Sequence, residues 1–197
     1  MKKALLLLPL IALVSCSSEK PEAGSTETID VTPENFAQAE TAWNFTNWAE
    51  KGAGTELVHL RDVAPTGPGA PTVRMNWDTL YSVRIVKVAD DKTFTVHLPE
   101  SDLYMSAHIL DSDGFAPYYI VEKGKDHEVT VNTDYALIIF RTEILDRKSE
   151  ESLKITHASQ DKIKVTGMMD AGYKAPNFGY IRNSQSSVRL SAQLPVG

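Results

Sequence analysis

The sequence has few of the features that would identify a reaction or a nucleic-acid partner. It contains one cysteine, Cys16, so it forms no internal disulfide. Its 20 basic residues are outnumbered by 26 acidic ones and form no cluster, which argues against a nucleic-acid partner. The Gly-x-Ser-x-Gly motif of serine hydrolases, the glycine-rich phosphate-binding loop and the His-Glu-x-x-His motif of zinc proteases are absent. We expect neither a cofactor nor a metal. The lack of catalytic motifs favours a function other than catalysis.

Long apolar runs are also rare, and the one at the N-terminus predicts export. Lys2 and Lys3 precede an apolar run over residues 4–14, which has the form of a secretory signal and is too short for a mature transmembrane span. The run ends in a Leu-Val-Ser-Cys tetrapeptide at Cys16 that resembles the bacterial lipobox. The resemblance implies a lipid-anchored protein, and Ser17 favours the outer membrane, facing the periplasm. An ordinary cleaved signal with an incidental cysteine is the alternative.

The remaining chain reads as one domain between two less regular segments. Residues 16–30 are rich in Ser, Glu and Thr and predict a disordered tether. Residues 31–166 carry the regular patterns and are long enough for a single core without disulfides. Residues 167–197 are dotted with glycine and serine and predict a mostly irregular tail. The expected order is therefore signal peptide 1–15, tether, domain and tail.

The domain begins with a well-marked helix. Thr32 is a natural N-cap and Pro33 suits the first helical turn, so the helix is predicted to run to about Lys51 and to stop at Gly52 or Gly54.

One buried stripe is predicted on that helix. Phe36, Ala39 and Trp43 share the stripe, whereas Phe45 and Trp48 lie off it. We expect the following loop to cover the second apolar surface, formed by Phe45 and Trp48. The alternative is that this surface faces a partner chain or a ligand pocket.

Period-two alternation dominates the rest of the domain and predicts β-strands with unequal faces. The fold class is therefore mainly β, an antiparallel sandwich or jelly-roll-like domain with an N-terminal helix and one short later helix from Ser149 to about Gln160. Residues 51–72 are predicted to be a loop. The expected strands lie in the stretch 73–88, which begins with a tight turn, and at residues 94–98, 103–109, 117–121, 127–131 and 135–144.

A polar group at the start of the first long strand is the best candidate for a binding site. Its side chains also suit a turn that is fixed by hydrogen bonds to the backbone, so an architectural role is the competing interpretation. The predicted ligand-binding residues are Arg74, Asn76, Trp77, Asp78, Tyr81 and Tyr104.

Catalytic candidates are weaker. His108 shares a strand face with Tyr104 and Ser106, and Asp78 is the nearest candidate base, so an acid–base pair of Asp78 and His108 is the hypothesis for an enzyme. Asp111 and Asp113 have the ordinary composition of a turn. The five histidines lie in separate elements without the spacing of metal ligands.

Several of these segments together resemble the bacterial domain-of-unknown-function family 1254, in order and over residues 31–165. The resemblance implies a β-sandwich-like domain of exported or membrane-associated proteins, commonly followed by a second β domain, family 1214. It implies a fold more than an activity. The segments that carry it are 31–54, Arg-Met-Asn-Trp-Asp-Thr-Leu-Tyr-Ser at 74–82, Phe-Thr-Val-His-Leu-Pro at 94–99, Tyr-Met-Ser at 104–106 and residues 157–165.

Two departures from the family pattern bear on function. Trp77 stands where the family has arginine, which removes a guanidinium able to pair bidentately with a carboxylate. The chain also stops at Gly197, about where the second domain would begin, so the protein is a solitary first domain or another chain supplies the second.

Two functions follow as hypotheses. The first is a lipid-anchored accessory module that binds a small molecule or a partner protein in the cell envelope. The second is a hydrolase-like enzyme, or an inactive relative of one, that uses Asp78 and His108.

Overall fold

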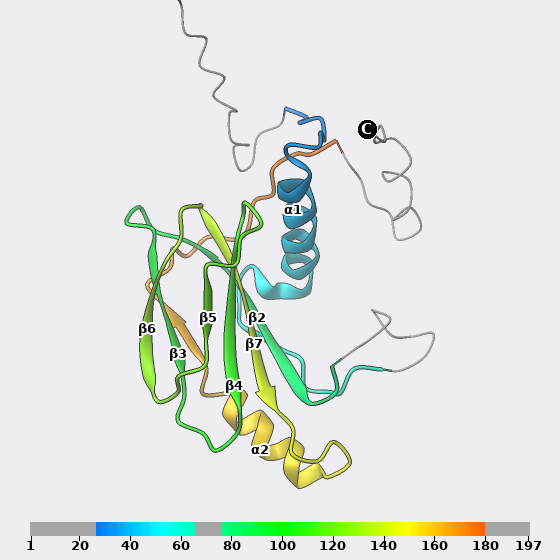
Figure 1. Cartoon of the computed structure of the whole chain (residues 1–197), viewed down its shortest axis with the longest axis vertical. Helices are drawn as coiled ribbons and strands as arrows, with labels where there is room; N and C mark the ends of the chain where they lie inside the picture. Colours follow the sequence, from blue (N-terminus) through cyan, green and yellow to red (C-terminus); the bar gives the residue numbers. More distant parts are fainter. Residues whose placement is uncertain (1–26, 66–75, 180–197) are drawn as a thin grey trace, which may run out of the picture.

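The computed structural model of the chain describes residues 27–65 and 76–179 (Figure 1). The predicted signal peptide, Cys16 and Arg74 lie outside the described residues, as do most of the predicted tether and the end of the predicted tail. In the described part no helix has the length and apolar character needed to cross a membrane.

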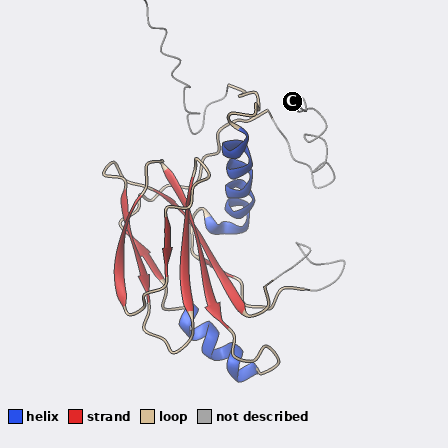
Figure 2. Cartoon of the chain, viewed as in Figure 1, coloured by secondary structure: helices blue, strands red, loops and turns tan. Residues whose placement is uncertain are grey.

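The domain consists of two antiparallel sheets with two helices at different ends (Figure 2). This confirms the predicted mainly β class with one N-terminal and one later helix. The six predicted strands are present within a few residues of their expected bounds. The larger sheet has the order β1 (Val58–His59), β2 (Thr79–Lys87), β7 (Tyr135–Glu143), β4 (Met105–Asp111) and β5 (Tyr118–Ile120), and the smaller one has β6 (Lys125–Thr130), β3 (Thr93–Leu98) and β8 (Lys164–Thr166).

The main core lies between the two sheets. Along β3, Phe94, Val96 and Leu98 are buried while the residues between them are half-buried, which is the alternation expected of a strand that packs on one side. They meet the inward residues of β4 and β7, such as Ile109 and Phe140. The sheets thus pack face to face in a sandwich-like arrangement.

The opposite face of the larger sheet carries a second core under the N-terminal helix. Helix α1 (Phe36–Trp48) continues into a short π-helical segment, η1 (Ala49–Ala53), which ends the helix at Gly52 with a φ of 98°. The end matches the prediction, but the start does not. Thr32 is not the cap, because its backbone N–H donates to Asn35 Oδ1. Asn35 occupies the cap position, and the helix begins at Phe36.

The buried stripe predicted on this helix is correct at Ala39 and wrong at Phe36. Phe45 is only 1% exposed, whereas Phe36 is 39% exposed. The helix rests on the sheet through Ala39, Ala42 and Phe45 because the two alanines let its backbone approach closely. The direction from which the sheet approaches decides which face is buried, and residue spacing does not contain that information.

Helix α2 (Glu150–Gln160) begins at the predicted cap, where Ser152 N donates to Ser149 Oγ over 3.3 Å. Its last turn is fixed to the edge of the larger sheet by Gln160, which is fully buried. Gln160 Nε2 donates to Tyr81 O and Ser82 Oγ over 3.2 and 3.1 Å, and its Oε1 accepts from Arg61 Nη1 over 3.2 Å. A buried amide with donor and acceptor both engaged fixes the position of α2.

The segment after β8 is irregular over the described residues up to 179, and it packs on the domain. Met169 forms a bridge with Lys87 and Phe178 one with Ile29, so the segment passes from the sheet edge to the start of α1. Tyr173 is carried into the second core beside Phe45. Strands β1 and β8 were not predicted, since both are too short for an alternating pattern.

Candidate functional site

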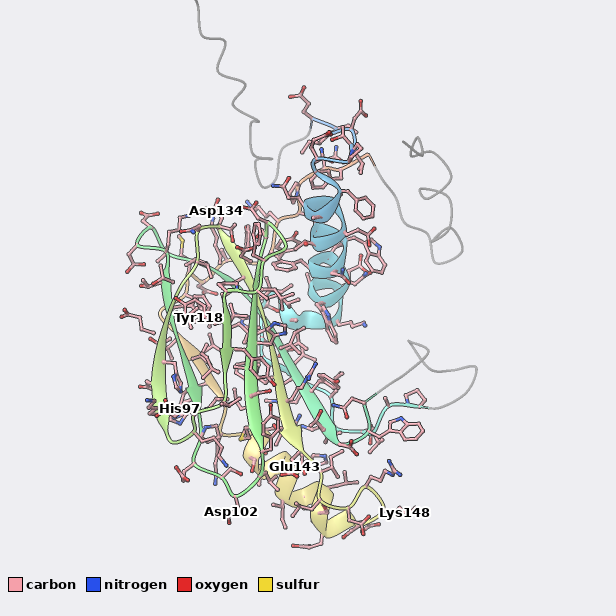
Figure 3. All side chains as sticks on the ribbon, viewed as in Figure 1. His97, Asp102, Tyr118, Asp134, Glu143 and Lys148 are labelled. Atoms are coloured by element: carbon pink, nitrogen blue, oxygen red, sulfur yellow. The ribbon has the colours of Figure 1, made fainter. Side chains whose placement is uncertain are left out.

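A cavity of about 180 Å³ lies where α1 meets the end of the larger sheet. Asp134, labelled in Figure 3, marks this end of the sheet, and Glu143 marks the other. Four segments of the chain form its walls: α1, the loop after β4, the loop before β7 and the segment after β8. The lining residues are Gln38, Thr41, Ala42, Phe45, Ser112, Asp113, Asn132, Thr133, Asp134, Tyr135, Tyr173, Lys174, Pro176 and Phe178.

Three aromatic rings form one wall of the cavity. Tyr173 packs against Tyr135 edge to face at 5.0 Å and against Phe45 at 5.5 Å between ring centroids. Burial raises the pKa of both tyrosines, so both phenols stay neutral at physiological pH. The Tyr173 hydroxyl donates to Ala42 O and the Tyr135 hydroxyl to Gly172 O, each over 3.5 Å, which leaves an apolar surface with weakly held polar tips.

The remaining wall is polar. Gln38 Nε2 donates to Asp113 Oδ1 over 3.1 Å, and Ser112 Oγ donates to Tyr135 O over 3.0 Å. Asp111 lies just outside the cavity and serves the turn, because its Oδ1 accepts from Asp113 N and Phe115 N. No group of three histidine, cysteine or acidic side chains able to hold a metal ion occurs within the described ranges.

A second polar constellation lies on the α1 side of the larger sheet, beyond the part that the helix covers. Arg141 of β7 pairs across the sheet with Tyr81 of β2 and Ser106 of β4, and its guanidinium carbon lies 5.7 Å from the Tyr81 ring centroid. His108 pairs with Tyr119 of β5, edge to face at 5.6 Å. Directly opposed residues share a face of the sheet, so these side chains lie on one surface.

The electrostatics of this surface depend on Arg141. Partial burial and then the positive charge of Arg141 lower the pKa of His108, which keeps the imidazole neutral at physiological pH. The nearby hydroxyls of Ser106 and Tyr104, in that order, lower the pKa of Tyr119 despite its partial burial, and Arg141 adds to the effect. The surface thus has the positive charge of Arg141 among hydroxyl and imidazole groups, and the Glu143 carboxylate, which accepts from Tyr104 N over 2.8 Å, lies on the same face two residues further along β7.

The predicted site residues at the start of β2 form a turn and do not line the cavity. Asn76 Oδ1 accepts from Asp78 N over 2.8 Å, and Asn76 Nδ2 donates to Thr79 Oγ1 over 2.9 Å. These bonds are those of the architectural interpretation. Trp77 lies under Arg147, 5.2 Å from the guanidinium carbon to the ring centroid. The turn is at the end of β2 opposite the cavity.

Asp78 and His108 are not brought together. Ile144 N donates to Asp78 O, whereas His108 pairs with Ile139, so the two lie five residue positions apart along β7, about 16 Å at the rise of a strand. A general base and its partner need a common substrate position within hydrogen-bonding reach. The predicted group divides: Tyr81, Tyr104 and His108 lie on the surface around Arg141, and Asn76, Trp77 and Asp78 lie beyond it.

A serine–histidine hydrogen bond is present elsewhere, between Ser82 Oγ and His59 Nδ1 at 2.7 Å. The Ser82 hydroxyl also accepts from Gln160 Nε2 over 3.1 Å, so its hydrogen bonds are used within the fold and the bond to His59 is structural.

The environment of His59 predicts a pH-dependent stability. Burial first, and then the charge of Arg61, lower its pKa, with Asp161 opposing. The unfolded chain therefore binds more protons below about pH 6.5, and the contribution of neutral His59 is lost as the pH falls from there through the lower folded pKa. We expect the midpoint urea concentration to decrease when the pH is lowered from 7.5 to 5.5. His59→Gln is expected to make this decrease smaller. An unchanged difference in the variant would exclude His59 as its source.

The sequence contained a signal for some of the residues that were missed and none for others. Arg141 directly follows six apolar residues, and counting by two from Tyr135 puts it on the face of Leu137 and Ile139, so its position is recognisable in the sequence. Tyr119 lies on a strand of three residues. Tyr173 follows no periodic pattern, and only tertiary packing reveals its place.

Comparisons with known proteins establish a fold likeness and nothing finer. No protein-family profile and no curated protein matches the chain. A solved structure, the VPA0106 protein from Vibrio parahaemolyticus, is similar with a TM-score of 0.51 and 16% sequence identity over 77% of this chain. This chain spans 41% of the length of the Vibrio protein. At such low identity the likeness concerns the fold alone.

Proposed function

We propose that the protein is a binding module of the cell envelope that takes a small organic molecule into the cavity between α1 and the larger sheet. The observation that carries the proposal is the cavity itself, which combines an aromatic wall of Phe45, Tyr135 and Tyr173 with a few polar groups. Small-molecule sites have this composition, since the apolar wall supplies affinity and a few polar groups orient the ligand.

The volume limits the ligand. An apolar cavity of about 150 Å³ binds benzene, so about 180 Å³ holds a molecule of one ring or a short chain. The polar wall adds a requirement for hydrogen-bonding groups at one end, where Asp113, Asn132 and Lys174 lie. We therefore expect an amphipathic molecule on the order of 100–150 Da.

The envelope part of the proposal rests on the sequence. The signal-like N-terminus and the lipobox-like tetrapeptide at Cys16 support export and lipid anchoring at the outer membrane, facing the periplasm. The resemblance to family 1254 is retained as part of the proposal. Under it, a second β domain on another chain is a candidate protein partner.

The hydrolase alternative has no specific support, because the separation of Asp78 from His108 removes the acid–base pair on which it rested.

The proposal is tested with two matched substitutions on α1. Ala42 lines the cavity, and Ala37 is exposed on the same helix and does not line it. We expect the full chain purified from its native membrane to release a small organic molecule on denaturation. Ala42→Leu is expected to reduce the amount at least tenfold, and Ala37→Leu is expected to leave it within twofold. Equal release from both variants, or no release from the unaltered chain, would contradict the proposal.

A further inference from the structure

The surface around Arg141 contains polar groups whose hydrogen-bonding capacity the fold leaves unused. Ser106 is fully buried, and its hydroxyl lies near the Tyr104 and Tyr119 phenols without meeting hydrogen-bond geometry to any group. Arg141 Nε is likewise buried and unpartnered. Within the described residues, no carboxylate forms an ion pair with Arg141. Such groups cost free energy unless a ligand engages them.

The groups around Ser106 and Arg141 determine which ligand would bind there. The hydroxyls of Tyr104 and Tyr119 are hydrogen-bonded to each other over 2.5 Å at the rim, and the two residues are 42% and 54% exposed. Phenol and serine hydroxyls donate well to an anionic oxygen, and the arginine supplies one positive charge. His108 stays neutral, so the site has no second fixed cation. One cation with several neutral donors suits a monoanion better than a phosphate dianion.

We propose that Arg141, with the hydroxyls of Ser106, Tyr104 and Tyr119, forms a binding site for a small monocarboxylate. The exposed Tyr104 and Tyr119 rings and the half-buried Tyr81 ring provide apolar contact for its organic body. The site is distinct from the α1 cavity, since Arg141 lies six residues along β7 from Tyr135, which lines that cavity. It does not depend on the proposed function.

Benzoate is the probe, with benzamide as its neutral counterpart of the same shape. We expect benzoate to shift the ring NMR signals of His108 and Tyr119 in the purified full chain with saturation, and benzamide not to do so. Arg141→Gln is expected to weaken binding at least tenfold. Arg147→Gln removes the same charge from the exposed turn near Trp77 and is expected to change binding less than twofold.

Ser106→Ala and Tyr119→Phe keep the test decisive if Arg141→Gln does not fold. Ser106→Ala is expected to weaken benzoate binding several-fold while leaving the melting temperature nearly unchanged, because no contact of the Ser106 hydroxyl has the geometry of a hydrogen bond in the folded protein. A purely structural serine would move stability and not binding.

Four results would overturn the inference: equal binding to the unaltered chain and Arg141→Gln, equal binding of benzamide, preference for inorganic phosphate, or no saturation at about 10 mM benzoate, where a millimolar ligand fills its site. Benzoate binding that Ala42→Leu abolishes and Arg141→Gln spares would assign benzoate to the α1 cavity and would also contradict the inference.

Discussion

Replacing Phe45 by alanine is expected to lower the free energy of unfolding by about 3–5 kcal/mol, the usual cost of truncating a buried aromatic ring. Phe45 is 1% exposed and touches both the sheet, through Val83 and Leu137, and the segment after β8, through Tyr173. Its loss leaves α1 without its main apolar contact and removes one side of the aromatic wall. Urea unfolding monitored by circular dichroism measures the change.

Phe36→Ala on the same helix is the matched control. Phe36 is 39% exposed and belongs to neither buried cluster, so about 1 kcal/mol or less is expected. Similar losses for the two variants would show that α1 does not rest on the sheet through Phe45, and the cavity would then not have the walls described above.

Replacing Gln160 by alanine is expected to cost about 2–4 kcal/mol. The change removes a fully buried side chain together with its bonds to Tyr81 O, Ser82 Oγ and Arg61. The last turn of α2 then loses its position on the sheet edge. We expect hydrogen exchange in α2 to accelerate more than exchange in β4 and β7.

Gln160→Leu separates the two contributions, because it retains most of the volume and removes the hydrogen bonds. It is expected to cost less than Gln160→Ala but still at least about 1 kcal/mol. If leucine were as stable as glutamine, the buried amide would have no role in fixing α2.

The sequence allowed the elements to be predicted better than their contacts. Alternation in β3 and β4 follows from one face being buried, and the Ser149 cap follows from local hydrogen bonding, so both are properties of short segments. The face of α1 that packs on the sheet is not such a property, and Phe36 was chosen where Phe45 is buried. The buried face is the one on which Ala39 and Ala42 let the helix approach the sheet closely and on which the Phe45 ring packs.

The candidate sites show the same limit. The polar turn of Asn76 and Asp78 was recognisable, but its hydrogen bonds are local, and a local pattern does not distinguish a turn from a binding site. The Arg141 surface depends on the register of four strands, and the cavity depends on the path of the segment that carries Tyr173. Neither is encoded within one segment. Tyr104 and His108 were predicted from the alternation of β4 alone, and they do share a face.

The most direct test of the central claim is a crystal structure of the full chain purified from its native membrane without added ligands. We expect continuous electron density for a small organic molecule in contact with Phe45, Tyr135 and Tyr173, with its polar end towards Asp113 and Lys174. A cavity that holds only water molecules bonded to its polar wall, or one filled by the protein's own side chains, would contradict the account.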